Sequence, residues 1–388
     1  MRTAKSQRGF SLLELMVASS IGLLMILAMT SLFKTGMDTT FTVTQRAETQ
    51  QNMRSAVELM TKDISMAGAG LPSGGLQLVT GGVRSNFACN QTGTCYVPAN
   101  TYPNSINGAQ NYMYGILPGF NNGVQNGVAI PNAPGQINSS VTSIYCDYNF
   151  PLSNFKFTFP TTTSASVAVV NGAVTPNNIL SPGGLNVGDL ILFIVSTPGN
   201  GTGVAGTSSV QNAAVVAEIT GIPNNTNISF ATGDALNFNQ TGAGNSNNLA
   251  SVSAAIAAGG GKAQTTACRL NAVTYFLQVP PAGGTVQTPR LMRQVNGYDA
   301  VPVADNIINL QFTYDVINFN TGFINANLAD PIAAGQSPGL IKKVNIWIMG
   351  ESLIQGGRKS QNMYLATSVS ARDMSFCNSY SSIATKCN

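Results

Sequence analysis

The chain of 388 residues is 44% hydrophobic but only 9% charged, and it contains no histidine. Its length is enough for one large or two ordinary domains with a sizeable apolar core. The absence of histidine excludes Ser-His-Asp and Cys-His catalysis and histidine-ligated zinc, so an enzyme of this sequence would lack the usual general base.

The net charge of +4 has its source at the N-terminus. Arg2, Lys5 and Arg8 precede the first apolar run, and the remaining Lys and Arg residues nearly balance the 15 acidic ones. This balance predicts no basic surface for nucleic acid. Few charges combined with abundant Gly, Ser, Thr and Asn are typical of a surface outside the cytoplasm.

The first apolar run, Leu15–Phe33, has 19 residues without a charge. As a helix it spans roughly 28 Å, about the thickness of the hydrocarbon layer of a bilayer. A cleaved secretory signal has a shorter apolar core and a small-residue cleavage site. Here the run continues into a helical pattern. We therefore expect residues 10–33 to be a retained transmembrane segment.

The helical pattern continues beyond the membrane-length run. Five apolar residues recur at alternating steps of four and three: Met53, Val57, Met60, Ile64 and Ala67. This spacing predicts one apolar stripe along a helix. Gly68 and Gly70 are suitable stop residues. We expect one helix from Phe10 to about Ala67, whose amphipathic half, residues 34–68, packs against another part of the chain.

The segment "RGF" followed by "SLLEL" resembles the prepilin signal of type IV pilins and type II secretion pseudopilins. In those proteins a basic leader ends in glycine, a dedicated inner-membrane peptidase cuts after it, and the new N-terminal residue is N-methylated. The resemblance implies that residues 1–9 are a cleaved leader. It assigns processing to Gly9 and Phe10 and N-methylation to Phe10.

Glu14 is a carboxylate at the start of the apolar helix. Such a charge is costly in a bilayer, although less so near the end of the span, where it can reach the interface. The resemblance implies a sharper role. In assembled filaments of this family, the glutamate of one subunit neutralises the N-terminal amine of a neighbour. Glu14 is thus expected to be a subunit-assembly residue rather than a catalyst.

After Gly70 the sequence changes to short β-type runs separated by Gly, Asn, Ser, Thr and Pro. Two runs, "IINLQFTYDV" and "KVNIWIM", alternate with a period of two and predict strands with one buried face. Further strands are expected at 189–195, 213–219, 272–279 and 363–370. The expected fold is α+β and pilin-like, with the long helix packed against an antiparallel β-rich head at residues 69–388.

Residues 97–140 and 196–262 are long and polar, and they predict loops. Loops of such length are either functional or mobile. Because no aromatic or charged cluster marks a site there, we favour surface decoration over a binding surface. The glycine-rich stretch 257–266 lacks the order of residues found in a phosphate-binding loop and predicts a turn. No catalytic, cofactor or metal site is expected.

An even number of cysteines behind an export signal predicts disulfides. A metal site is the alternative, but neither histidine nor metal-type spacing is present. The simplest pairing joins sequence neighbours first: Cys89–Cys95, Cys377–Cys387 and then Cys146–Cys268.

The start "SLLELMVASSIGLLMI" and the runs "GDLILFI", "AVTYFLQV" and "IKKVNIWIM" are also similar to PilW-type minor pilins. This resemblance implies a structural protein of a type IV pilus, supporting adhesion, twitching motility or DNA uptake. The implied partners are the prepilin peptidase, other minor pilins, the major pilin and a pilus-tip adhesin. The head would be periplasmic, anchored in the inner membrane before assembly, and displayed on the cell surface afterwards.

Two alternatives remain open from the sequence. A J-type pseudopilin of type II secretion shares the signal, the long helix and a β-rich head. A membrane-anchored adhesin or binding module is a different class, and its head should bind a ligand without other pilins. Co-purification with pilus or with secretion components distinguishes a PilW-type minor pilin from a J-type pseudopilin.

Overall fold

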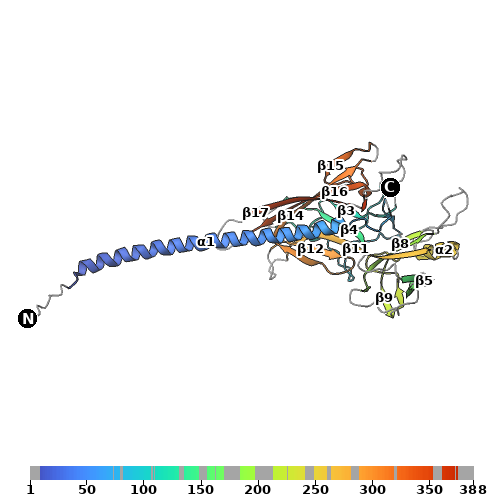
Figure 1. Cartoon of the computed structure of the whole chain (residues 1–388), viewed down its shortest axis with the longest axis horizontal. Coiled ribbons are helices and arrows are strands. Elements are labelled where there is room, and N and C mark those ends of the chain that lie inside the picture. The colour runs from blue at the N-terminus through green and yellow to red at the C-terminus, as the bar shows by residue number, and fades with distance from the viewer. Residues whose placement is uncertain are drawn as a thin grey trace, which may run out of the picture.

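The computed structural model describes residues 9–72, 74–78, 82–105, 108, 110–130, 135–147, 155–161, 163–169, 184–196, 213–224, 226–240, 249–259, 264–280, 288–318, 321–352, 361–371, 373 and 374. One long helix, α1, projects from a β-rich head, and the N-terminus lies at the far end of that helix (Figure 1). The structure therefore has the expected α+β architecture.

Helix α1 spans Leu12–Ser65, close to the predicted limits. Its described side chains before Thr49 are exposed or half-buried, whereas the buried ones lie in its last part: Thr49, Met53, Ala56, Val57, Met60, Asp63 and Ile64. The predicted apolar stripe is the face that packs on the head. The buried Asp63 was not part of that prediction.

The larger sheet of the head has seven antiparallel strands built around the long strand β11 (Gln264–Gln278). The first half of β11 pairs with β7, and its second half pairs with β4 and β12. The other strands are β3 (Ile116–Gly119), β4 (Ser140–Asp147), β7 (Leu190–Ser196), β8 (Ala213–Glu218), β12 (Arg290–Val295) and β13 (Val301–Asp305).

A second sheet of four strands has the order β15-β14-β16-β17. Its strands are β14 (Ile307–Ile317), β15 (Ile324–Leu328), β16 (Ile341–Glu351) and β17 (Asn362–Ser370), with the 3-10 helix η4 (Pro338–Leu340) before β16. The C-terminal part of α1 contacts β13 of the larger sheet and β16 and β17 of this one. The helix thus covers the edges of both sheets, which is why one apolar stripe suffices to bury it.

A lobe is inserted in the chain between β4 and β11. It contains β5 (Phe155–Thr161), β6 (Ser164–Val169), β9 (Gly221–Asn224), β10 (Asn227–Ser229) and the helix α2 (Leu249–Gly259). Its core contains Phe157, Phe193 and Phe230. The ring centroid of Phe193 lies 5.1 Å from that of Phe157 and 5.7 Å from that of Phe230. Figure 1 shows the lobe at the end of the head opposite the projecting part of α1.

The ranges 97–140 and 196–262, predicted as long loops, each contain some regular elements. The first contains β2 (Tyr112–Met113), which pairs with β1 (Leu76–Gln77), as well as β3 and the 3-10 helix η1 (Gln125–Gly127). The second contains β8, β9, β10 and α2. The predicted turn at 257–266 begins inside α2 and ends inside β11, and residues 260–263 between them lie outside the described part. The strand expected at 213–219 is β8, whereas the other elements of the two ranges are short or rich in small residues, so their periodicity is weak.

The disulfides Cys89–Cys95 and Cys146–Cys268 are present with the pairing favoured from the sequence. The second joins β4 to β11 near the point where β11 exchanges β4 for β7 as its partner. Cys377 and Cys387 lie outside the described residues, as do the leader residues Arg2, Lys5 and Arg8.

The chain leaves α1 through a close backbone contact. Gly68 has φ +87°, and its N–H donates to the carbonyl oxygen of Ile144 on β4 at 2.8 Å. A Cβ on Gly115 would lie 2.6 Å from the backbone nitrogen of Gly68, closer than real Cβ contacts allow. Both glycines are therefore needed where the end of the helix meets β4.

Candidate assembly site

The predicted processing site lies at the free end of α1. Gly9 and Phe10 immediately precede the helix, and the Phe10 side chain is 86% exposed. Ser11 is the N-cap residue of α1, with an extended backbone, and its hydroxyl oxygen accepts a hydrogen bond from the Leu13 N–H at 3.3 Å. The structure thus places the exposed residues Gly9 and Phe10 in front of a capped helix.

Glu14 lies in the first turn of α1 and contacts Ser11, the residue that caps the helix. Its carboxylate Oε2 accepts a hydrogen bond from the Ser11 N–H at 3.1 Å, which completes a capping box. The negative charge also lies at the positive end of the helix dipole. Within one chain Glu14 therefore has a local role beside the assembly role expected from the sequence.

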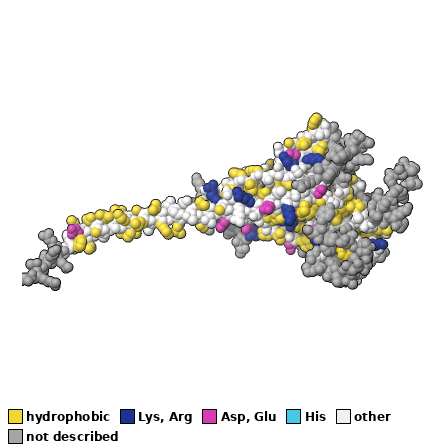
Figure 2. All heavy atoms as spheres, in the orientation of Figure 1, with side chains coloured by type: hydrophobic (Ala, Val, Ile, Leu, Met, Phe, Trp, Pro, Cys, Tyr) yellow, Lys and Arg dark blue, Asp and Glu magenta, His cyan; other side chains and the backbone are white. Residues whose placement is uncertain are grey.

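The first part of α1, up to Phe33, forms an apolar surface that the head does not cover. Leu15, Met25 and Phe33 are 64%, 61% and 69% exposed, and Figure 2 shows hydrophobic side chains along the projecting helix. Within the described residues, α1 is the one helix long and apolar enough to cross a membrane. Such a surface needs either lipid or other helices around it.

A buried charge holds the other end of α1 to the head. Asp63 accepts hydrogen bonds from the hydroxyls of Tyr145 on β4 and Tyr275 on β11 at 2.9 and 2.6 Å. Its Oδ2 also lies 2.8 Å from Nε of Arg293 on β12. Burial, with the Asp63 carboxylate beside them, raises the pKa of both tyrosines, so both phenols stay protonated and can donate. Three strands of the larger sheet therefore fix one residue of the helix.

Several carboxylates of the head are buried. Asp189 is 4% exposed and accepts a hydrogen bond from the Tyr298 hydroxyl at 2.8 Å, and Asp147 forms an ion pair with Arg269. Burial raises the pKa of Asp189. Each of these groups is satisfied within the fold, so they hold β4, β7 and β11 together rather than forming an open reaction centre.

Glu218, at the end of β8, is 3% exposed and accepts a hydrogen bond from the Leu236 N–H at 3.0 Å. Burial raises the pKa of Glu218 to about 8, and the hydrogen bond and charge of the neighbouring Asp234 act in the same direction. Asp234 accepts hydrogen bonds from the N–H groups of Phe238 and Asn239 at 2.6 and 2.9 Å. Glu218 and Asp234 therefore hold the turn at 234–239 through these hydrogen bonds, and the raised pKa of Glu218 favours its protonated form.

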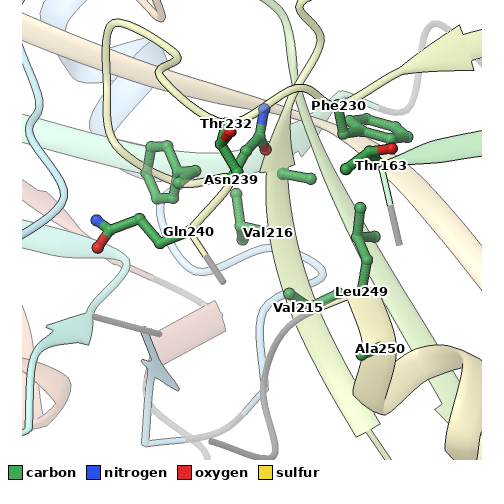
Figure 3. A pocket seen from close by; sticks show the side chains of 11 residues that line it. Thr163, Val215, Val216, Phe230, Thr232, Asn239, Gln240, Leu249 and Ala250 are labelled. Atoms are coloured by element: carbon green, nitrogen blue, oxygen red, sulfur yellow. The ribbon is translucent and has the colours of Figure 1, made fainter. Parts of the chain in front are cut away.

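A hollow of about 190 Å³ lies in the inserted lobe between β8, the start of α2 and the segment after β10 (Figure 3). Val215, Val216, Phe230 and Leu249 line it, and the Asn239 amide beside them is engaged with the backbone of Glu218 and Ala231. None of the described lining residues is a carboxylate, a lysine, an arginine or a cysteine. The hollow is chiefly a packing gap with apolar walls.

The prokaryotic N-terminal methylation motif matches residues 4–30 of the chain. A comparison with curated proteins and one with solved structures found no match. The motif implies processing by a prepilin peptidase, anchoring in the membrane and assembly with pilin-type partners. Because it covers the exposed apolar start of a long helix that carries a β-rich head, the motif indicates that this chain is a type IV pilin-like or pseudopilin protein.

Proposed function

We propose that the chain is a minor pilin of the PilW type that takes part in priming, assembly or tip structure of a type IV pilus. The observation that carries this proposal is the arrangement along α1. The methylation motif and Glu14 lie at one end of a helix that is uncovered up to about Thr49 and apolar up to Phe33. The other end is fixed in the head through Asp63. A rigid head on a helix that other helices can surround is the shape of a filament subunit.

The size and build of the head support a minor rather than a major subunit. About 320 residues follow α1, in two sheets and an inserted lobe, whereas major pilins of this family usually have a much smaller head. A head of this size is easier to place at the end of a filament than at every position of its shaft.

We also propose that the chain has no enzymatic activity. The buried carboxylates described above are engaged in hydrogen bonds or ion pairs inside the fold. Its work would be mechanical: apolar helices pack side by side, heads dock through their surfaces, and a separate motor supplies energy.

The experiment is fractionation of the native host after an epitope tag is placed in an exposed loop of the head. Sheared pili, periplasmic and membrane fractions are probed, and tagged protein is captured from each. Recovery in sheared pili together with other pilins supports the proposal. Capture with type II secretion components identifies a J-type pseudopilin instead. Recovery in membranes without other pilins favours an anchored adhesin.

A further inference from the structure

A second hollow, in the larger part of the head, has a different lining. It measures about 350 Å³, the lower end of the range for small-ligand sites, and lies between the segment after β3 and the segment before β4. Its described lining consists of amide, small and aliphatic residues: Pro98, Asn121, Asn122, Val124, Gly127, Val128, Ala129, Ile130, Gly135, Gln136 and Asn138. None of these residues carries a charge.

The amides divide into a fixed and a free group. The Asn138 amide accepts from the Leu310 N–H at 2.9 Å and donates to the Gln136 carbonyl oxygen, so it belongs to the frame. The side-chain amides of Asn121 and Asn122 make no hydrogen bond within the part of the chain that the structure describes. Gln136 Oε1 accepts from Asn309, and its side-chain N–H groups have no protein partner among the described residues.

Hydrogen bonds to two strands fix the backbone beside these amides, of which Asn121 and Gln136 are exposed and Asn122 is half-buried. The Ser139 N–H donates to the Leu310 carbonyl oxygen at 2.8 Å and the Leu277 N–H donates to the Gly123 carbonyl oxygen at 2.7 Å. The hollow is therefore attached to β14 on one side and to β11 on the other. Free amides on a fixed frame are the usual source of orientation and specificity in a small-molecule site.

The lining selects the chemistry of a ligand. A charged molecule would lose water without meeting an opposite charge, and a purely apolar one would leave the amides unpaired. Amide groups both donate and accept, as hydroxyl groups do. Val128, 50% exposed, and Pro98 offer aliphatic surface for C–H groups. A neutral sugar ring has hydroxyls at its edge and C–H groups on its faces, so it meets both requirements.

An extended peptide fits less well. Such a segment binds by pairing its backbone with the exposed edge of a sheet. The described lining of this hollow comes instead from Pro98 and from residues within 121–130 and 135–138, which contribute side-chain amides rather than a free strand.

We propose that this hollow is a binding site for a single neutral sugar unit, with Asn121, Asn122 and Gln136 as the hydrogen-bonding residues. The site does not depend on pilus assembly, so it can be present or absent whatever the outcome of the fractionation above.

The test uses the full processed chain in a zwitterionic detergent without a sugar head group. Saturation-transfer NMR is recorded with methyl glycosides of glucose, galactose and mannose, with N-acetylglucosamine, with glucuronate as the charged control, and with triglycine as the peptide control. At least one neutral sugar is expected to give a saturable signal, and glucuronate and triglycine are expected to give none.

The variant Asn121→Gly/Asn122→Ala removes both amides, and glycine tolerates the positive φ of Asn121. Its sugar signal is expected to fall at least tenfold. Ala129→Leu, which fills the hollow, should have the same effect. Asn362→Ala on β17, outside the hollow, should bind as the parent does. The proposal is overturned if no neutral sugar binds, if triglycine or glucuronate binds better, or if both hollow variants bind like the parent while remaining folded.

Discussion

Asp63 on α1 and Tyr275 on β11 are joined by a hydrogen bond of 2.6 Å, although 212 residues separate them in sequence. The carboxylate is 2% exposed, so the tyrosine hydroxyls and Arg293 replace the water that it would otherwise bind. This contact is the most specific link between the helix that carries the methylation motif and the head. The orientation of the head relative to α1 therefore depends on the polar contacts of Asp63 as well as on the packing of the apolar stripe.

Asp63→Ala should lower the free energy of unfolding by about 3–5 kcal/mol, because it leaves Arg293 and two phenols without their partner in a buried site. Chemical denaturation followed by fluorescence of the single tryptophan, Trp347, measures the change. Lys62→Ala, at an exposed neighbouring position, is the matched control and should change stability by less than about 0.5 kcal/mol. Equal effects of the two substitutions would contradict a specific role of Asp63.

Glu218 predicts a pH dependence in the inserted lobe. The folded chain holds the Glu218 proton up to about pH 8, whereas the unfolded chain releases it near its ordinary value of 4.5. The folded state therefore binds more protons in this window, and the contribution to stability is lost as pH rises from about 4.5 to 8. The loss accumulates across this window to an amount on the order of a few kcal/mol.

Glu218→Gln keeps the acceptor for Leu236 and cannot ionise. Subtracting its unfolding free energy from that of the parent at each pH isolates the effect of this carboxyl from that of the other acids. The parent should lose several kcal/mol relative to the variant between pH 4.5 and 8. A difference that does not vary with pH would show that Glu218 is ionised throughout.

The junction after α1 should not tolerate a side chain at residue 115. Gly115→Ala puts its Cβ against the backbone of Gly68, and neither backbone can move without breaking its pairing with β4. We expect a loss of about 1–3 kcal/mol, as for other overpacked sites. Gly221→Ala is the control, because its nearest neighbour would lie at 3.6 Å. A Gly115→Ala protein as stable as this control would refute the close contact.

Glu14 has two candidate roles that substitutions can separate. Glutamine keeps the hydrogen bond to the Ser11 N–H but removes the charge, whereas alanine removes both. If the charge pairs with the N-terminus of a neighbouring subunit, both Glu14→Gln and Glu14→Ala should be processed normally but captured with other pilins far less than the parent. If Glu14→Gln assembles like the parent and only Glu14→Ala fails, the residue acts as a helix cap and the pairing role is wrong.

Much of the fold could be predicted from regular patterns. The alternation in "IINLQFTYDV" and "KVNIWIM" corresponds to β14 and β16, and the stripe ending at Ala67 corresponds to the packed face of α1. Burial of the apolar face produces a readable period, although β14 also buries Asn309 and Asp315 of its polar face.

The inserted lobe and the Asp63 contact could not be predicted in the same way. Strands β9 and β10 have four and three residues, too few to show a period, and α2 is an Ala-rich helix within a polar region. Asp63 follows Lys62 on a helix with many charges, so the sequence carries no signal that this carboxylate is buried. Only the pairing of β4, β11 and β12 brings its three partners together.

The most direct test of the central claim is the intact mass and N-terminal chemistry of the chain recovered from membranes, after expression with its native prepilin peptidase. If the chain is processed as a prepilin, residues 1–9 are lost and the amine of Phe10 carries a methyl group. The Gly9→Val variant, expressed and measured in the same way, should retain residues 1–9. An uncut parent chain, a cut beyond the apolar part of α1, or normal processing of Gly9→Val would contradict the account.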